Sequence, residues 1–217
     1  MKRNILLLLV ATSVSASQLF GQGKASFGVR AGVNFQNITG KDAVGDKLDN
    51  GLTTGFNAGV NAEIPVGIDF YIQPGVLFST KGAGKIDESD DKINLSYIEV
   101  PVNFLYKPEL GTGHLILGFG PYAAFGIGGK YKPESGGDQE IEFKNKITAA
   151  QAISGDIFFK GFDAGANLLF GYETSSRFSV QLNAQLGLTE INPKIEGVSD
   201  KSSWKNTGFG ISAGYRF

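Results

Sequence analysis

The side chains best able to do chemistry in this 217-residue chain are charged residues that interrupt segments rich in apolar residues, glycine and amides. Enclosed acids and bases can form a proton or ion relay, or they can form ion pairs and hydrogen bonds that offset the free-energy cost of burial. Ion pairing is the commoner use, so we expect a structural polar network. Its predicted members are Arg30, Glu63, Asp69, Glu99, Lys107, Asp163, Glu173 and Arg216.

Nucleophilic catalysis has one candidate base, because the chain has a single histidine and no cysteine. That histidine, His114, directly follows the short segment Pro108–Gly113. Hydrolysis or acyl transfer would need it beside a serine and a carboxylate. We expect a polar residue that flanks a turn, and therefore no catalytic residue.

Metal and phosphate sites are weakly supported. The acidic run Asp87, Glu88, Asp90 and Asp91 could bind calcium, but Lys92 stands where an EF-hand needs glycine and Ile98 where it needs the bidentate acid. The glycine-rich segments 82–85 and 128–130 lack the spacing and the following Ser or Thr of a phosphate loop. We expect a solvated acidic loop, turn glycines, and no metal or cofactor.

Charge and composition narrow the classes further. The chain has 20 Lys and Arg against 21 Asp and Glu, so no basic field favours nucleic acid. Residues 1–21 combine Lys2 and Arg3 with the apolar run Ile5–Ala11 and then small residues, which is typical of a signal peptide. Cleavage is predicted after Gly21, with Ala16 as an alternative, and 22–217 as one domain.

The elements that carry the charged residues alternate with a period of two. In the first segment the positions from Phe27 to Phe35 are alternately apolar and polar, as in a strand with one apolar and one polar face. Eight such segments follow one another: Ser26–Asn37, Thr54–Ile64, Asp69–Ser79, Tyr97–Lys107, Leu115–Ile127, Phe162–Glu173, Phe178–Thr189 and Thr207–Phe217. Their apolar faces carry no charge, whereas a charge facing lipid at mid-height costs about 2–4 kcal/mol.

Connection lengths favour a membrane barrel over a soluble sandwich or lipocalin-like barrel. The short connections Pro65–Ile68, Pro108–Gly113 and Thr174–Arg177 alternate with long ones at Ile38–Thr53, Thr80–Ser96, Gly128–Gly161 and Glu190–Asn206. Short periplasmic turns and long extracellular loops are the outer-membrane plan. The polar faces are rich in glycine and asparagine, which suits the narrow interior of eight strands. This plan places His114 at the periplasmic rim.

Aromatic residues are predicted to form two girdles at the membrane interfaces. The lower girdle comprises Phe27, Phe70, Tyr106, Tyr172, Phe178, Tyr215 and Phe217, and the upper one Phe35, Phe56, Phe78, Phe125, Phe162 and Phe209. Pro74, Pro101 and Pro121 interrupt the strands, and because proline lacks an N–H donor we expect β-bulges there. In the loop 128–161, residues 140–144 are expected to extend a hairpin and 147–153 to form a helical turn.

Four short motifs resemble the PorT-like outer-membrane β-barrel family of Bacteroidota. They are Ile72-Gln73-Pro74-Gly75-Val76, Tyr97-Ile98-Glu99-Val100-Pro101-Val102, Gly118-Phe119-Gly120-Pro121-Tyr122 and Phe162-Asp163-Ala164-Gly165-Ala166. The terminal Phe217 also resembles the signal read by the barrel-assembly machinery. The resemblance implies an eight-stranded outer-membrane barrel, but it implies no particular activity.

The sequence as a whole predicts an all-β, eight-stranded antiparallel transmembrane β-barrel without enzymatic activity. Its role is expected to be structural, adhesive or accessory to secretion, acting through extracellular loops that contact an unidentified partner. Outer-membrane lipid and lipopolysaccharide are its expected surroundings. The alternatives are an enzyme that modifies membrane lipids and a soluble periplasmic ligand-binding barrel.

The predicted network yields a first test. If Arg30 and Glu99 help to offset the burial of charge, Arg30→Ala and Glu99→Ala each lower the unfolding temperature of the refolded barrel. The measurement is thermal unfolding followed by circular dichroism. Unchanged melting in both variants would contradict a structural network.

Overall fold

A computed structural model describes residues 24–86, 89–198 and 201–217. The predicted signal peptide, 1–21, lies outside these residues, and so do Asp87 and Glu88 of the acidic run. Within the described residues, no helix has the length and apolar character needed to cross a membrane.

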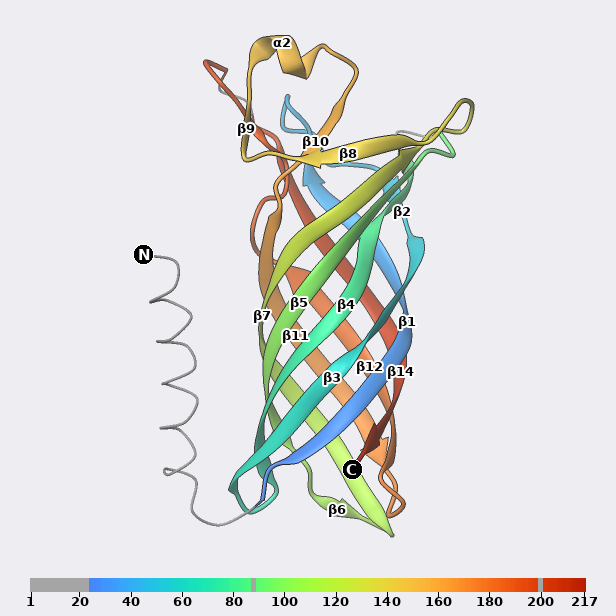
Figure 1. Ribbon diagram of the computed structural model, residues 1–217, viewed down its shortest axis with the longest axis vertical. Coiled ribbons are helices and arrows are strands. Elements are labelled where there is room, and N and C mark those ends of the chain that lie inside the picture. Colours follow the sequence, from blue (N-terminus) through green and yellow to red (C-terminus); the bar gives the residue numbers. More distant parts are fainter. Residues whose placement is uncertain (1–23, 87–88, 199–200) are drawn as a thin grey trace.

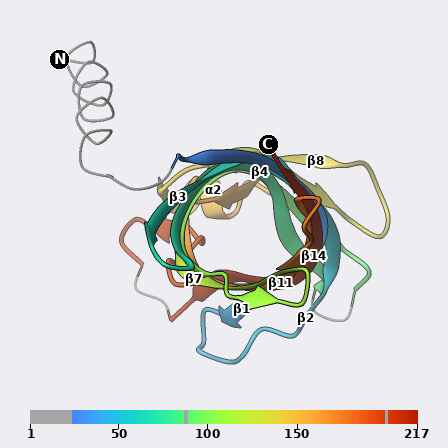
Figure 2. The same ribbon diagram turned by 90° about the horizontal axis from the view of Figure 1, so that it is seen from below.

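Eight long strands form a closed antiparallel barrel (Figure 1). Each strand pairs with the next long strand along the chain, and the last pairs with the first from Gly28↔Arg216 to Lys41↔Ser203. Seen along its axis, the sheet makes a complete ring (Figure 2). The predicted fold class is therefore confirmed. The strands are β1 (Ser26–Lys41), β3 (Thr53–Gly67), β4 (Phe70–Ile86), β5 (Lys92–Tyr106), β7 (Gly113–Lys132), β11 (Phe162–Glu173), β12 (Phe178–Gly187) and β14 (Ser203–Arg216).

The two ends of the barrel differ. The three short connections lie together at one end, here called the turn end, with the short strand β6 (Glu109–Leu110). The opposite end, here called the loop end, carries β2 (Asn50–Gly51), β8 (Gln139–Phe143), β9 (Lys146–Ile147), α2 (Ala149–Ala152), β10 (Ile157–Phe159) and β13 (Lys194–Ile195) (Figure 1).

The apolar face of the alternation lies on the outer wall. Val100, Leu117 and Leu182 are 39%, 37% and 53% exposed, which means that they point away from the lumen. In a soluble barrel these side chains would fill the centre instead. Because hydrocarbon cannot hydrogen-bond to backbone groups, a sheet with such a wall must close on itself, and this one does.

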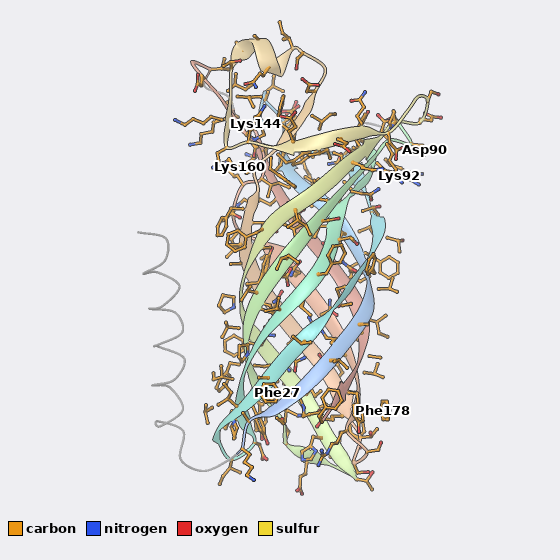
Figure 3. All side chains as sticks on the ribbon, viewed as in Figure 1. Phe27, Asp90, Lys92, Lys144, Lys160 and Phe178 are labelled. Atoms are coloured by element: carbon orange, nitrogen blue, oxygen red, sulfur yellow. The ribbon has the colours of Figure 1, made fainter. Side chains whose placement is uncertain are left out.

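Aromatic contacts occur near both predicted rims. Toward the loop end, ring pairs join neighbouring strands at Phe35–Phe209, Phe56–Phe78 and Phe125–Phe162, with centroids 5.4, 5.3 and 5.5 Å apart. Toward the turn end, Phe70 stacks on Tyr106 and Phe178 packs on Tyr215, both at 4.8 Å. Phe27 and Phe178 mark the lower level (Figure 3).

Several strands extend beyond their predicted ends. The connection predicted at Thr80–Ser96 is mostly strand, because β4 continues to Ile86 and β5 begins at Lys92. Their added rungs run from Thr80↔Ser96 to Gly84↔Lys92. The predicted hairpin extension is present as β8 paired with β7. The predicted helical turn is α2, whose N-terminus is capped by a capping box of Thr148 and Gln151.

The prediction of β-bulges at the prolines is wrong. The register runs on without a shift past Pro74, Pro101 and Pro121, and the irregularities lie at Asn50/Gly51, Pro65/Gly67 and Ser96/Tyr97. Proline removes a donor but inserts no extra residue, so the strands remain extended and in register.

The outer wall yields a depth-dependent test. Leu182, in the middle of β12, pairs with Phe170 and Ile211, whereas Leu188 lies just past the loop end of the same strand. We expect Leu182→Arg to lower the free energy of unfolding in lipid vesicles by about 2–4 kcal/mol, and the matched control Leu188→Arg by about 0–1 kcal/mol. Urea titration of vesicle-inserted protein measures both. Equal stabilities for Leu182→Arg and the wild type would contradict a lipid-facing wall.

Candidate functional site

Four charged residues form a closed ring of ion pairs inside the turn end. Lys107 Nζ lies 2.9 Å from both Glu63 Oε2 and Glu173 Oε1. Arg216 completes the ring by pairing with Glu63 and, at 3.3 Å, with Glu173 Oε2. The two acids and two bases balance in charge, and they tie β3, β11 and β14 to the end of β5 across the lumen.

A second polar cluster lies nearer the loop end and is centred on Lys81, a residue that the sequence interpretation missed. Lys81 Nζ lies 3.0 Å from Glu99 Oε2 and 3.1 Å from Asp163 Oδ2, and its side chain is fully buried. The Tyr122 hydroxyl donates to Asp163 at 3.2 Å, and the Asn206 amide donates to the same oxygen at 3.0 Å. Lys81 was missed because its strand was predicted to end at Ser79; continued alternation points residue 81 inward.

Arg30 adds a further positive charge to this part of the lumen. It lines a small enclosed cavity together with Glu99 and the amides Asn34, Asn57 and Gln185. Gln185 Nε2 donates to both Glu99 oxygens at 3.0 Å. The volume that the centre of a water molecule could occupy in this cavity is about 20 Å³, so the cavity has room for about one water molecule. This level of the lumen is therefore nearly filled.

Asp69 does not join either cluster. It lies half-buried in the turn between β3 and β4 with φ of 62°, a conformation that aspartate tolerates in turns. Its backbone carbonyl accepts a hydrogen bond from the Lys107 N–H at 2.7 Å. The structure thus gives Asp69 a place in a turn. The ion pairs of the lumen join Lys81 with six of the predicted residues, namely Glu63, Glu99, Lys107, Asp163, Glu173 and Arg216. Arg30 lines the same cavity as Glu99 but makes no ion pair with the described residues.

Between the two clusters one part of the inner wall is apolar, although this face was predicted to be polar; buried amides such as Gln73 and Asn103 also point inward. Leu105, Ile116 and Leu169 pack together there. Gly118 makes the packing possible, because a Cβ atom at this position would lie 2.4 Å from Leu105 Cδ2.

The loop end is closed by a hydrophobic core that the long loops build over the barrel mouth. We call β8, β9, α2, β10 and β13 the cap. Phe159 and Ile141 of the cap are buried against Tyr97 of the wall. The ring of Phe143 lies where a side chain at Gly126 would stand, since a Cβ atom there would come within 2.5 Å of it. Aromatic cap residues therefore plug the lumen.

In the described part of the acidic run, the side chain of Asp91 binds to β7 and to the residues that follow it. Asp91 accepts hydrogen bonds from the Tyr131 hydroxyl and, at 2.7 Å, from the Glu134 N–H. The hydrogen bond from Tyr131 holds the pKa of the Asp91 carboxyl below its ordinary value. Among the described residues, no three His, Cys, Asp or Glu side chains come together as metal ligands would.

His114 lies at the turn end, as the second residue of β7. It pairs in register with Glu109 of β6 and Glu173 of β11. The chain has no other histidine, so a Ser–His–acid site at the loop end is excluded.

Comparison with known families decides the class of this barrel. The model of the outer membrane protein beta-barrel domain family matches residues 16–192. The chain belongs to this family. It is therefore an outer-membrane barrel. Its short turns face the periplasm and its long loops face the outside of the cell, as the alternation of connection lengths predicts. The cap is extracellular, and the ring of four ion-paired residues lies at the periplasmic end.

Three solved structures are similar to this chain at low sequence identity. Neisserial surface protein A (NspA) has a TM-score of 0.47 at 12% identity, covering 90% of this chain and 100% of that one. The attachment invasion locus protein Ail of Yersinia pestis, in complex with a heparin analogue, has a TM-score of 0.43 at 13% sequence identity. A major outer membrane protein of Thermus thermophilus has a TM-score of 0.44 at 15% identity. Both comparisons cover 90% of this chain and 100% of the other. A search of curated proteins found no match.

The ring at the periplasmic end yields a stability test. Lys107→Met removes the cation that lies between Glu63 and Glu173, so two buried acids lose a partner. We expect the free energy of unfolding to fall by about 3–5 kcal/mol. The double variant Lys107→Met/Glu173→Gln restores charge balance and should recover part of this loss. Urea titration in vesicles measures both variants. A single variant as stable as the wild type would show that the ion pairs do not stabilise the barrel.

Proposed function

We propose that this barrel is a non-enzymatic outer-membrane protein that acts through its folded extracellular cap, in a structural, adhesive or secretion-accessory role. The observation that carries the proposal is the closed loop end. Tyr97 of the wall and Phe159 of the cap are both fully buried in one core, so the long loops are folded onto the barrel mouth. A folded surface of this kind, held on a rigid barrel, is suited to contacting a partner.

Filling of the lumen supports a role outside transport. The periplasmic ring, the apolar cluster around Leu105, the Lys81 cluster and the cap core succeed one another along the axis. Eight strands leave only enough interior space for side chains, and these four groups occupy it. A general porin would need an open aqueous path instead.

The position of the single histidine supports the absence of enzymatic activity. An enzyme acting on outer-leaflet lipids would need its base at the extracellular rim, whereas His114 lies at the periplasmic one. The competing proposal of a soluble periplasmic barrel is contradicted by the apolar outer wall and by the family.

We also propose that the chain is one of the PorT-like barrels of Bacteroidota. The four motifs that resemble this family lie on β4, β5, β7 and β11, which are consecutive neighbours around the barrel. Phe217 is exposed, and its N–H donates to the Phe27 carbonyl at 2.8 Å, so the pairing of this segment with the first strand continues past β14.

Two measurements test the proposed function. In planar bilayers the purified protein should give no large, steady channels, because the lumen is filled. In cells, a photo-crosslinking residue at Ile153, 86% exposed after α2, should give adducts with a cell-surface macromolecule. The matched control is Ile68, 89% exposed in a periplasmic turn, where those adducts should be missing.

The opposite results would overturn the proposal. Large steady conductance would indicate a transport pore. Adducts at Ile68 alone would move the contact surface to the periplasm, and altered lipid masses in a strain that overexpresses the protein would indicate an enzyme.

A further inference from the structure

Lys81, Glu99 and Asp163 meet in a part of the lumen that bulk water does not reach. The side chains of Lys81 and Asp163 have no exposed surface, and that of Glu99 is 4% exposed. Lys81 Nζ lies 3.1 Å from Asp163 Oδ2 and 3.0 Å from Glu99 Oε2. An amine held this close to one carboxyl group, with a second carboxylate beside it, has the groups that amide formation requires.

Hydrogen-bond donors are directed at the Asp163 carboxyl group. The Tyr122 hydroxyl and the Asn206 amide donate to Asp163 Oδ2 at 3.2 and 3.0 Å. Such donors stabilise the negative charge that develops on a carboxyl oxygen when a nucleophile attacks the adjacent carbon. They also hold the carboxyl group in place beside the lysine, and groups oriented in this way react as if present at about 10⁵–10⁸ M.

Glu99 is placed to carry protons between the two reacting groups. It contacts Lys81 Nζ directly, and Gln185 Nε2 fixes its orientation by donating to both carboxylate oxygens at 3.0 Å. A carboxylate in this position can take a proton from the ammonium group and give it to a departing oxygen. The small cavity that Glu99 lines has room for about one water molecule, so it can receive the water that leaves.

An amide would remove two buried charges together. In a buried ion pair such as Lys81 and Asp163, the cost of desolvation offsets much of the Coulombic attraction. Joining the two side chains eliminates one positive and one negative charge. Arg30 and Glu99, which line the same cavity, keep their opposite charges, so this level of the lumen stays balanced.

The ring at the periplasmic end provides an internal comparison. Lys107 also lies between two carboxylates, 2.9 Å from each. There, however, Arg216 pairs with both acids, and a guanidinium ion holds a carboxylate in its charged, unreactive form. The side chains of Glu173 and Arg216 are 10% and 11% exposed, so water reaches this ring. The two lysines have similar distances to carboxylates but different surroundings.

We propose that Lys81 and Asp163 become joined by an intramolecular amide bond after the barrel has folded. The Lys81 nitrogen forms a bond with Asp163 Cγ, and the bond from that carbon to one carboxyl oxygen breaks. Glu99 carries two of the three ammonium protons in turn to this oxygen, which leaves as water, and the third proton stays on the amide nitrogen. An ammonium and a carboxylate thus become a neutral amide and one water molecule, without an oxidant or co-reactant.

The amide ties the barrel wall together beneath the cap. Lys81 of β4 and Asp163 of β11 are 82 residues apart, and β5 and β7 lie between these strands in the sheet. Tyr97 of β5 and Tyr122 of β7 belong to the same hydrophobic core as Phe159 of the cap. The link therefore fixes the base on which the cap is folded, and it does not depend on what the cap contacts.

The test is peptide mapping by mass spectrometry of the full mature chain taken from the outer membrane. Trypsin does not cleave after an acylated lysine, so an amide at Lys81 leaves residues 48–85 attached to residues 161–177. We expect this branched peptide, lighter than its two parts by one water molecule, in place of the separate peptides 48–81 and 161–177. Chain recovered unfolded from inclusion bodies should give the separate peptides, and refolding the same chain should produce the branched one.

Variants test the role of each group. Glu99→Gln keeps the size of the side chain but removes the proton carrier, so we expect the branched peptide to form about 100-fold more slowly after refolding. The matched control Glu173→Gln removes a carboxylate from Lys107 instead and should form the amide at the wild-type rate. Lys81→Arg should form none. Heat-modified gel migration checks that each barrel is folded.

Three results would overturn the proposal. The first is full recovery of the separate peptides from folded wild-type protein. The second is formation of the branched peptide at an equal rate in Glu99→Gln and the wild type. The third is a link at Lys107, because residues 93–130, in which proline follows Lys107 and blocks cleavage, should be recovered unlinked.

Discussion

The absence of hydrogen-bonding partners in the hydrocarbon core is the constraint on which the rest of this structure depends. Every backbone N–H and C=O at that depth must be satisfied within the protein, so the sheet has to close, and β14 closes it on β1 over fourteen register pairs. Closure then divides the side chains in two. Apolar residues such as Leu168 and Leu182 face outward, and most of the enclosed charged residues pair with one another in the narrow interior.

That enclosure explains the two polar clusters. Glu63 and Glu173 share Lys107 and Arg216, and Lys81 lies between Glu99 and Asp163. Each cluster joins strands that are distant around the ring, so the lumen residues act as braces across the barrel. The apolar group of Leu105, Ile116 and Leu169 and buried amides such as Gln73 and Asn103 lie between them. Because the lumen is packed in this way, the extracellular cap is the surface that we propose for contacts with other molecules.

The barrel was predictable from sequence because a period of two is a local signal that repeats in every membrane-spanning strand. The same signal placed Glu99 and Asp163 on the inner face. The signal failed where strands leave the membrane. Beyond Ser79 the residues no longer alternate between apolar and polar, although the side chains still alternate in direction, and the inward position of Lys81 was therefore missed. The hydrophobic core of the cap could not be predicted for a different reason: Phe159 packs in the same core as Tyr97 only because a long loop folds over the barrel mouth. The prediction of β-bulges at the prolines was wrong because proline lacks a backbone N–H donor but does not insert an extra residue into the strand.

The central claim is that hydrocarbon surrounds the outer wall, and the single tryptophan of the chain permits a direct measurement. Trp204 lies in the extracellular core, so Trp204→Phe gives a silent background, and Leu182→Trp in that background places one fluorophore on the wall. The account predicts strong quenching by lipids brominated on their acyl chains and little quenching by aqueous iodide. Quenching by iodide without quenching by brominated lipid would contradict it.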